Sequence, residues 1–278
     1  MGKTMDIQRI SAFALNGQGG NPAGVVLLNE LPDASVMQAI AADVGYSETV
    51  FAAPQGDGFR TRYFAPQAEV AFCGHATIAL GAALGAANGA GVYPLILNDT
   101  EVSVEAVQVA DGWAATLQSP PTSYRAADKA LVSQALDMFG WDMQDIDANL
   151  DIVLANGGAE HLLIPLKDHC LLQEMSYDFD TGAKMMQEFG LVTINLIWRD
   201  ANGTVHSRNP FAGHGVYEDP ATGAAAAALA GYLRDAGHAD QPFDIYQGAD
   251  MGVPSLLQVV PLKGKGSAVR VSGATRKI

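Results

Sequence analysis

Cys73-Gly74-His75-Ala76-Thr77 runs into IALGAALGAA at 78–87, and Asp219-Pro220-Ala221-Thr222-Gly223 runs into AAAAALAGYL at 224–233. In both places a short polar loop precedes a helix made almost wholly of small apolar residues. Glycine beside a helix start lets a ligand come close to the backbone N–H groups of the first turn. The repetition, at about half the chain length, predicts two related domains with a site between their two helices.

The length of the chain fits this division. Its 278 residues are comfortable for two domains of about 100–150 residues each. The clearest break is Ser119-Pro120-Pro121-Thr122, because paired prolines cannot continue a helix or a central strand. We therefore predict an N-terminal domain over 1–121 and a C-terminal domain over 122–266, with a last strand at about 267–278 that returns to the first domain.

Charge and cysteine content exclude several classes of partner. With 30 acidic and 16 basic residues the formal net charge is −14, which disfavours nucleic acid, because phosphate backbones are bound by clustered Lys and Arg. No run has the roughly 18–20 apolar residues of a membrane span. Only Cys73 and Cys170 are present, too few for a disulfide framework, and this indicates a reducing cytoplasm.

Residue patterns also place the secondary structure. Helical spacing predicts helices at 33–44, with Asp33 as N-cap, and at 77–87, 129–139, 181–189 and 221–235. Short apolar or alternating runs predict strands at 7–13, 23–28, 48–53, 59–64, 101–109, 113–117, 151–155, 161–165, 192–198, 204–209, 258–261 and 268–273. Short strands indicate curled sheets, and the Ala-rich helices indicate burial against close neighbours.

Four polar segments stand out in this chain. They are Asn21-Pro22-Ala23-Gly24, Tyr46-Ser47-Glu48-Thr49, Cys73-Gly74-His75-Ala76-Thr77 and Glu218-Asp219-Pro220-Ala221-Thr222-Gly223. In this order and at these separations they resemble the phenazine-biosynthesis PhzF-like family, within the wider diaminopimelate-epimerase-like fold. The likeness extends from about Asp6 to the C-terminus and includes Gln247-Gly248.

The resemblance implies an α/β (α+β) fold of two similar domains related by a pseudo-twofold axis. Each would be a strongly curved, barrel-like, mainly antiparallel sheet around a central helix. It also implies a homodimer with a cofactor-independent isomerase site in the interdomain cleft. The chemistry implied is transfer of a proton between carbons of a small carboxylated metabolite by general acid/base catalysis.

The same resemblance assigns roles to residues of the motifs. Glu48 matches the family's catalytic glutamate, and a partly desolvated carboxylate suits a general acid/base; the alternative is a strand-end glutamate in a surface pair. His75 and Asp219 are expected to contact substrate, although a lone His is more often structural, and Asp before Pro is also a common helix N-cap. Gly74 and Gly223 would bind a substrate carboxylate through backbone N–H groups, or would simply form tight turns.

Cys73 requires a separate hypothesis, because related epimerases of this fold use two cysteines as opposed bases. The second position corresponds to Pro220 here, and Cys170 lies far from that motif in sequence. A thiol-dependent epimerase or racemase using Cys73 is therefore the disfavoured alternative, and a buried, inert thiol is favoured. Asn21, Thr222 and Ala224 are further candidate site residues.

Two departures from the family pattern concern the substrate contacts. Ala224 stands where Ser usually follows Thr-Gly, and Val253 stands where many members have Arg. These losses favour a competing hypothesis, a small-molecule-binding or regulatory protein without turnover. The spacing of His161, His169, His206 and His214 does not indicate a metal site, so we expect no metal and no cofactor.

Overall fold

The computed structural model describes residues 6–278, and the chain divides into two compact units. Unit 1 comprises the chain up to Gln118 together with Ser272–Ile278, and unit 2 comprises Ser119–Val271. The sequence predicted the division after residue 121 and a return near 267, so the contact-defined limits lie a few residues away. Residues 1–5 of the first predicted domain lie outside the described residues.

The elements follow one another as a mixture of short strands and helices. Unit 1 contains β1 (Gln8–Ala12), β2 (Asn21–Leu27), α1 (Ala34–Val44), β3 (Thr49–Gln55), β4 (Gly58–Phe64), β5 (Glu69–Val70), α2 (Gly74–Asn88), β6 (Gly91–Ile96), β7 (Glu101–Val109) and β8 (Gly112–Gln118). Unit 2 contains β9 (Ser123–Ala126), α3 (Lys129–Phe139), β10 (Val153–Asn156), β11 (Glu160–Pro165), α4 (His169–Gln173), α5 (Phe179–Phe189), β12 (Thr193–Arg199), β13 (Val205–Phe211), the 3₁₀ turn η1 (Ala212–His214), β14 (Val216–Asp219), α6 (Gly223–Asp235), β15 (Phe243–Gln247), the 3₁₀ turn η2 (Ala249–Met251) and β16 (Ser255–Pro261). The last strand, β17 (Val269–Lys277), begins in unit 2 and continues into unit 1.

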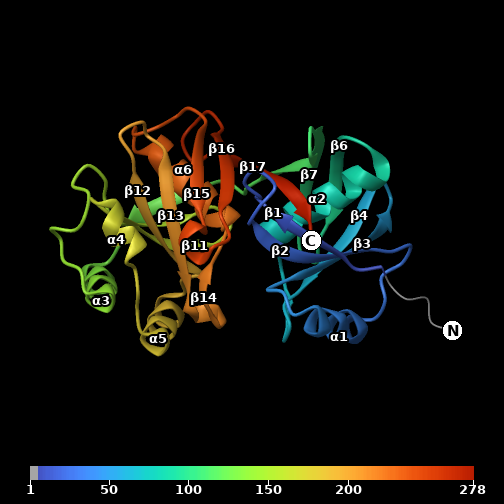
Figure 1. Cartoon of the computed structure of the whole chain (residues 1–278), viewed down its shortest axis with the longest axis horizontal. Coiled ribbons are helices and arrows are strands. Elements are labelled where there is room, and N and C mark those ends of the chain that lie inside the picture. Colours follow the sequence, from blue (N-terminus) through green and yellow to red (C-terminus); the bar gives the residue numbers. More distant parts are fainter. Residues whose placement is uncertain (1–5) are drawn as a thin grey trace. The chain divides into compact units, whose positions relative to one another are not determined.

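Unit 1 is a closed barrel of eight strands within the described residues. The strands pair in the order β1–β2–β3–β4–β6–β7–β8–β17, and β17 returns to β1. β2–β3 and β4–β6 are parallel, whereas the other pairs with a described register are antiparallel. Because the sheet closes on itself, no long strand edge is left open for pairing with other chains. α2 runs through the barrel and contacts β1, β2, β7 and β8 (Figure 1).

Unit 2 repeats this plan. Its strands pair in the order β9–β10–β11–β12–β13–β15–β16, with β11–β12 and β13–β15 parallel. α6 contacts β9 and β10 at one end of this order and β16 at the other. One helix can reach both ends only if the sheet curves around it, as Figure 1 shows for α6.

The two units share one order of pairings, element by element. In unit 1 an antiparallel pair (β1–β2) is followed by a parallel crossover to β3, a hairpin to β4, a short strand β5, the central helix and β6, which is parallel to β4. In unit 2 the series β10, β11, β12, β13, β14, α6 and β15 follows the same scheme. The repeat expected from the two loop–helix motifs is therefore a repeat of topology.

The central helices fit inside their sheets because their residues are small. In α2 every residue from His75 to Gly85 is buried. A Cβ added at Gly81 would lie 2.6 Å from Val104 Cγ2 and 2.8 Å from Ala115 Cβ, on β7 and β8. A Cβ at Gly231 of α6 would lie 2.5 Å from Thr122 Cβ. These approaches are closer than a methyl group allows. Gly81 therefore sets the distance between α2 and its sheet, and Gly231 sets the distance between α6 and the residue before β9.

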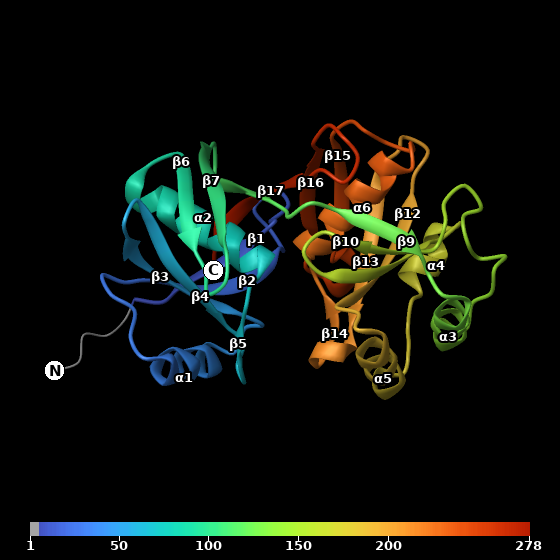
Figure 2. The same cartoon turned by 180° about the vertical axis from the view of Figure 1, so that it is seen from behind.

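Other helices lie outside the sheets. α1 packs Met37 and Ala41 against Val26, Phe51 and Phe64, in a small cluster on the outer face of β2, β3 and β4, and Figure 2 shows it apart from α2. Asp33 is the N-cap of α1, as predicted, although its side chain makes no capping hydrogen bond. Within residues 6–278 we find no helix with both the length and the apolar character needed to span a membrane.

The packing of α2 gives a stability prediction. Gly81→Ala gains about 1 kcal/mol of helix propensity but forces a methyl group against Val104 and Ala115, and overpacking of this kind costs about 1–3 kcal/mol. Because Ala115 Cβ is fixed to the backbone of β8, we expect a net loss in the free energy of unfolding, measured by urea titration. The matched control is Gly91→Ala, at a position with no heavy atom within 4 Å of the added Cβ, and it should change the value by less than about 0.5 kcal/mol. Equal values for the two variants would contradict the packing account.

Candidate active site

Glu48, Cys73 and His75 come together at the start of α2 in unit 1. Glu48 directly precedes β3, Cys73 is the N-cap of α2, and His75 lies in its first turn. His75 Nε2 lies 3.3 Å from Glu48 Oε2 and 3.9 Å from Cys73 Sγ, while Nδ1 lies 3.4 Å from that sulfur. The side chains of His75 and Glu48 are 8% and 15% exposed. The structure thus groups a carboxylate, an imidazole and a thiol in a largely desolvated position.

Backbone and hydroxyl contacts hold these groups in place. Gly24 N–H donates to the carbonyl of Glu48, which fixes the residue at the parallel junction between β2 and β3. Thr77 Oγ1 donates to the carbonyl of Cys73 at 2.7 Å, and the Tyr63 hydroxyl lies 2.7 Å from the same Thr77 oxygen. Burial raises the pKa of Tyr63 well above its ordinary value, so the phenol stays neutral. Ser47 Oγ lies 3.4 Å from His75 Nε2. This residue belongs to the Tyr46–Thr49 motif, but the sequence analysis did not predict it as a site residue.

A second polar cluster, in unit 2, surrounds Asp219 at the end of β14. Thr222 Oγ1 donates to Asp219 Oδ2 at 2.6 Å. Gln247 Nε2 donates to the carbonyl of Asp219 at 2.6 Å, and Gln247 Oε1 accepts from the N–H of Thr222 at 3.1 Å. All three residues are buried. Gln247 belongs to the Gln247-Gly248 motif of the family resemblance, but the sequence analysis predicted no role for it. Its position next to Gly248 at the end of a strand does not indicate a contact with Asp219 or Thr222.

A buried ion pair supports the Asp219 cluster. Arg208 on β13 donates to both oxygens of Glu218, at 3.0 and 2.6 Å, and its Nη1 also donates to the carbonyls of Leu172 and Gln173 at the end of α4. Charge-assisted bidentate pairs have well-defined geometry. Because Glu218 immediately precedes Asp219, the pair fixes the strand end from which Asp219 projects.

The two central helices start differently from the predictions. α2 starts at Gly74 instead of Thr77, and α6 at Gly223 instead of Ala221. The N-cap of α6 is Thr222, and Asp219 is the last residue of β14, so the alternative of Asp219 as helix N-cap is wrong. The predicted starts thus differ from the observed ones by three residues at α2 and two at α6, less than one helical turn.

The remaining candidates lie at the starts of strands and helices. Asn21 is buried at the start of β2, Gly74 and Gly223 open the two central helices, and Ala224 lies in the first turn of α6. Neither α2 nor α6 has a side-chain cap hydrogen bond, whereas Asp128 caps α3 and Asp178 caps α5. The first-turn N–H groups of both central helices therefore donate no hydrogen bond to an N-cap side chain.

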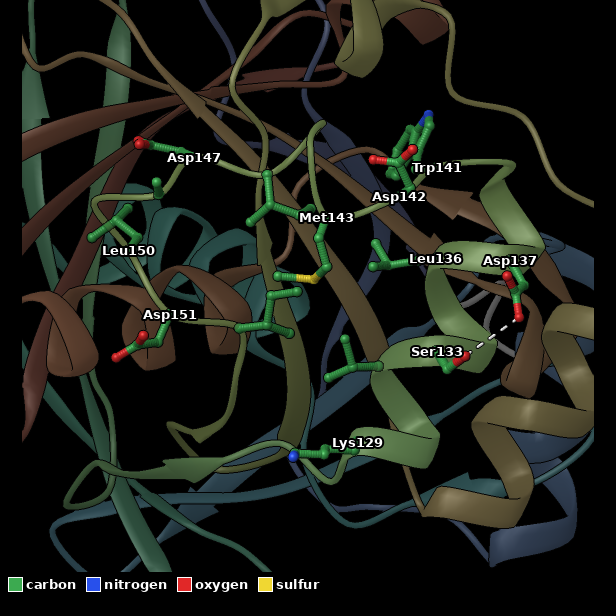
Figure 3. A pocket seen from close by; sticks show the side chains of 14 residues that line it. Lys129, Ser133, Leu136, Asp137, Trp141, Asp142, Met143, Asp147, Leu150 and Asp151 are labelled. Atoms are coloured by element: carbon green, nitrogen blue, oxygen red, sulfur yellow. Dashed lines mark hydrogen bonds between the residues drawn. The ribbon is translucent and has the colours of Figure 1, made fainter.

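A pocket of about 680 Å³ in unit 2 lies apart from these residues. Figure 3 shows its lining from α3 and the segment 141–152, with the side chains of Leu136, Met143 and Leu150 around it. None of the predicted site residues lines it. Several of its aspartates cap turns in the same segment, for example Asp142, which accepts from the N–H of Gln144, so turn formation accounts for their positions.

Comparisons with known proteins agree with the motifs. The profile of the family described as phenazine biosynthesis-like protein matches residues 10–276. The chain belongs to this family. An uncharacterized isomerase of Deinococcus radiodurans is 30% identical over 95% of this chain and 90% of its own length.

Solved structures share the fold. A PhzF-family phenazine biosynthesis protein of Bacillus anthracis superposes with a TM-score of 0.86 at 22% identity, covering 100% of this chain and 98% of that one. A predicted epimerase of Pseudomonas aeruginosa gives 0.84 at 24% identity, covering 99% and 97%. The fold of two similar α/β units is therefore that of the phenazine biosynthesis-like family, and the family and its relatives together assign the chain to the isomerases.

In this phenazine biosynthesis-like chain the two units differ in the residues at the junction before β3 and before its equivalent strand β12. Glu48 precedes β3 in unit 1, and Val192 precedes the equivalent strand β12 in unit 2. Gly24 is the register partner of Thr49 on β3, whereas His161 is the partner of Thr193 on β12. Only unit 1 has a carboxylate at this junction. In unit 2 a buried His161 donates to or accepts from Thr193 Oγ1 at 2.8 Å instead.

His161 gives a pH prediction. His161 is 0% exposed, and desolvation lowers the pKa of its imidazole from 6.5 to about 3. The folded pKa lies below the unfolded one, so the unfolded chain binds the proton first, and stability is lost as the pH falls below about 6.5. From pH 7 to pH 5 this residue should remove about 2 kcal/mol from the free energy of unfolding. In His161→Gln the loss over the same interval, measured by urea titration at each pH, should be smaller by that amount; an unchanged pH dependence would refute the assignment.

Proposed function

We propose that this isomerase moves a proton between two carbons of a small carboxylated metabolite, with the Glu48 carboxylate as general acid/base. The observation that carries the proposal is the 3.3 Å contact of Glu48 Oε2 with His75 Nε2 in a position where Glu48 is only 15% exposed. A base that is partly withdrawn from water and held by one partner keeps a defined direction toward a substrate.

The proposed step balances as a two-stage proton transfer. Glu48 Oε2 takes a proton from an acidic carbon, so that the C–H bond breaks and an O–H bond forms while the electron pair moves into the adjacent unsaturated system. The carboxyl O–H then exchanges its proton with water and delivers a proton to a different carbon, and the double bond shifts. His75 stabilises the carboxylate in its orientation when Nε2 carries the ring proton. No cofactor enters this scheme.

The asymmetry between the units favours a single acid/base over two opposed bases. Val192 stands at the position equivalent to Glu48, and Pro220 stands at the position predicted for a second thiol. Cys170 is exposed on α4. One carboxylate that both removes and returns the proton suits a shift between carbons, whereas inversion at one carbon usually needs an acceptor and a donor on opposite faces.

The helix starts at Gly74 and at Gly223 each stay a predicted contact for a substrate carboxylate. Gly74 and Gly223 open helices whose N-cap side chains make no capping hydrogen bond. The partial positive charge of a helix N-terminus favours an anionic group. Asp219, held by Thr222 and Gln247, stays a predicted substrate contact. The homodimer and the cytoplasmic location stay predictions as well.

The competing proposal is a binding or regulatory protein without turnover. It rests on Ala224 and Val253, which replace a hydroxyl and a cation of the family pattern. Its distinctive outcome is ligand binding in the absence of any proton exchange.

Deuterium uptake from D₂O, followed by mass spectrometry over a panel of cyclic and linear carboxylated metabolites, tests the proposal. The wild type should introduce deuterium into one class of compound. Glu48→Gln keeps the shape and removes the base, so uptake should fall by about 100-fold or more. Glu101→Gln, an exposed glutamate on β7 of the same unit, is the matched control and should retain wild-type uptake.

Two results would contradict the assignment. Wild-type uptake in Glu48→Gln would exclude Glu48 as the base and direct attention to Cys73. Binding of a panel compound without uptake in the wild type would support the binding-protein alternative.

A further inference from the structure

The contacts around His75 Nε2 are spaced unusually for hydrogen bonds. Glu48 Oε2 lies at 3.3 Å, Ser47 Oγ at 3.4 Å and Cys73 Sγ at 3.9 Å from this one nitrogen. Good N–H···O hydrogen bonds have donor–acceptor distances of about 2.7–3.2 Å. A ring nitrogen also carries one proton or one lone pair, so it cannot satisfy three partners. Three polar groups thus converge on Nε2, while Nδ1 of the same ring lies 3.4 Å from Cys73 Sγ.

The same spacing suits atoms that share a metal ion. In a tetrahedral zinc site, with Zn–S of about 2.3 Å and Zn–N and Zn–O of about 2.0–2.2 Å, neighbouring ligand atoms lie about 3.3–3.6 Å apart. Among the described residues, Glu48, Cys73 and His75 form a group whose ligand atoms all lie within 4.8 Å of one another. The observed separations of 3.3 and 3.9 Å from His75 Nε2 lie close to the tetrahedral values, and the Glu48 and Cys73 ligand atoms lie within 4.8 Å of each other.

Charge and donor type point to the same ion. A thiolate and a carboxylate together carry two negative charges, so a divalent cation would leave the largely buried group neutral. Sulfur and imidazole ligands select zinc-like ions over the hard Mg²⁺ and Ca²⁺. Three protein ligands leave the fourth tetrahedral position for water or another small ligand. The spacing of histidines in the sequence gave no sign of such a site, because its ligands come from two separate motifs.

We propose that Glu48, Cys73 and His75 form a binding site for Zn²⁺, and that the bound ion blocks proton transfer by Glu48. On binding, the Cys73 thiol releases its proton to solvent as the S–Zn bond forms, Glu48 binds through an ionised oxygen, and His75 binds through a ring-nitrogen lone pair. The blocking part rests on the proposed function, because the ion occupies the lone pair that would accept the substrate proton. The binding part stands on the geometry alone.

Cobalt substitution tests the binding part without any turnover. The full chain is treated with a chelator, desalted and titrated with Co²⁺, which takes the place of Zn²⁺ and shows near-ultraviolet charge-transfer absorption when a thiolate binds it. We expect saturation at one equivalent and loss of the absorption when Zn²⁺ is added. Cys73→Ser should abolish it, whereas Cys170→Ser, which removes the other, exposed thiol, should keep it. No absorption in the wild type, or equal absorption in Cys73→Ser, would overturn the site.

A second variant guards against misfolding of Cys73→Ser. Zn²⁺ affinity, measured by competition with a chromophoric chelator, should fall at least about tenfold in His75→Gln, with the far-ultraviolet circular dichroism spectrum unchanged. Unchanged affinity in a folded His75→Gln would overturn the site as well.

Deuterium uptake with and without one equivalent of Zn²⁺ tests the blocking part. Loss of uptake that a chelator restores is expected. Uptake that persists at saturating Zn²⁺ would overturn blocking while the cobalt absorption still decides binding. A wild type without uptake in any compound would instead count against the proposed function, and the cobalt result would remain valid.

Discussion

The close approach between each central helix and its surrounding sheet is the constraint on which the structure depends. Gly81 of α2 and Gly231 of α6 leave no room for a methyl group, and a helix of larger residues would force the strands apart. Because α2 is buried nearly all round, its axis and its first residue are fixed by packing. The positions of Cys73 and His75 at that first turn are consequences of the same packing.

The repeated scaffold carries unequal chemistry. Both units use the same strand pairings, yet the junction before the third strand of the repeat bears Glu48 in one and Val192 in the other. Unit 2 has a chain of buried hydrogen bonds instead. Thr193 Oγ1 lies 2.8 Å from His161 Nδ1 and donates to Asn209 Oδ1 at 3.0 Å. One copy of the repeat thus has a carboxylate at this junction, while the other uses the equivalent region for polar contacts within the core. Fold alone would not assign a function to either.

The two loop–helix motifs and the short apolar runs predicted two domains and most of their elements. The curved sheet around each central helix was implied by the family resemblance. Short elements with weak local signals were not predicted, namely the strands β5, β6, β9, β14 and β15 and the helix α4. β6 contains Pro94, which argues against a central strand; the barrel accommodates it because the ladder between β6 and β4 uses only Leu95 and Ile96. Ser47 and Gln247 gained their contacts from chain segments distant in sequence, and no local pattern could indicate them. The convergence of Glu48 with Cys73 depended equally on folding, since their motifs lie on separate elements.

The central claim is that the carboxylate of Glu48 is itself the group that carries the proton. Chemical rescue measures this most directly: Glu48→Ala is assayed for deuterium uptake into the substrate class found with the wild type, with and without added formate. The account predicts that the variant is inactive and that formate, a small carboxylate able to enter the space left by the side chain, restores uptake in proportion to its concentration. Uptake at the wild-type rate in Glu48→Ala without formate would contradict the account.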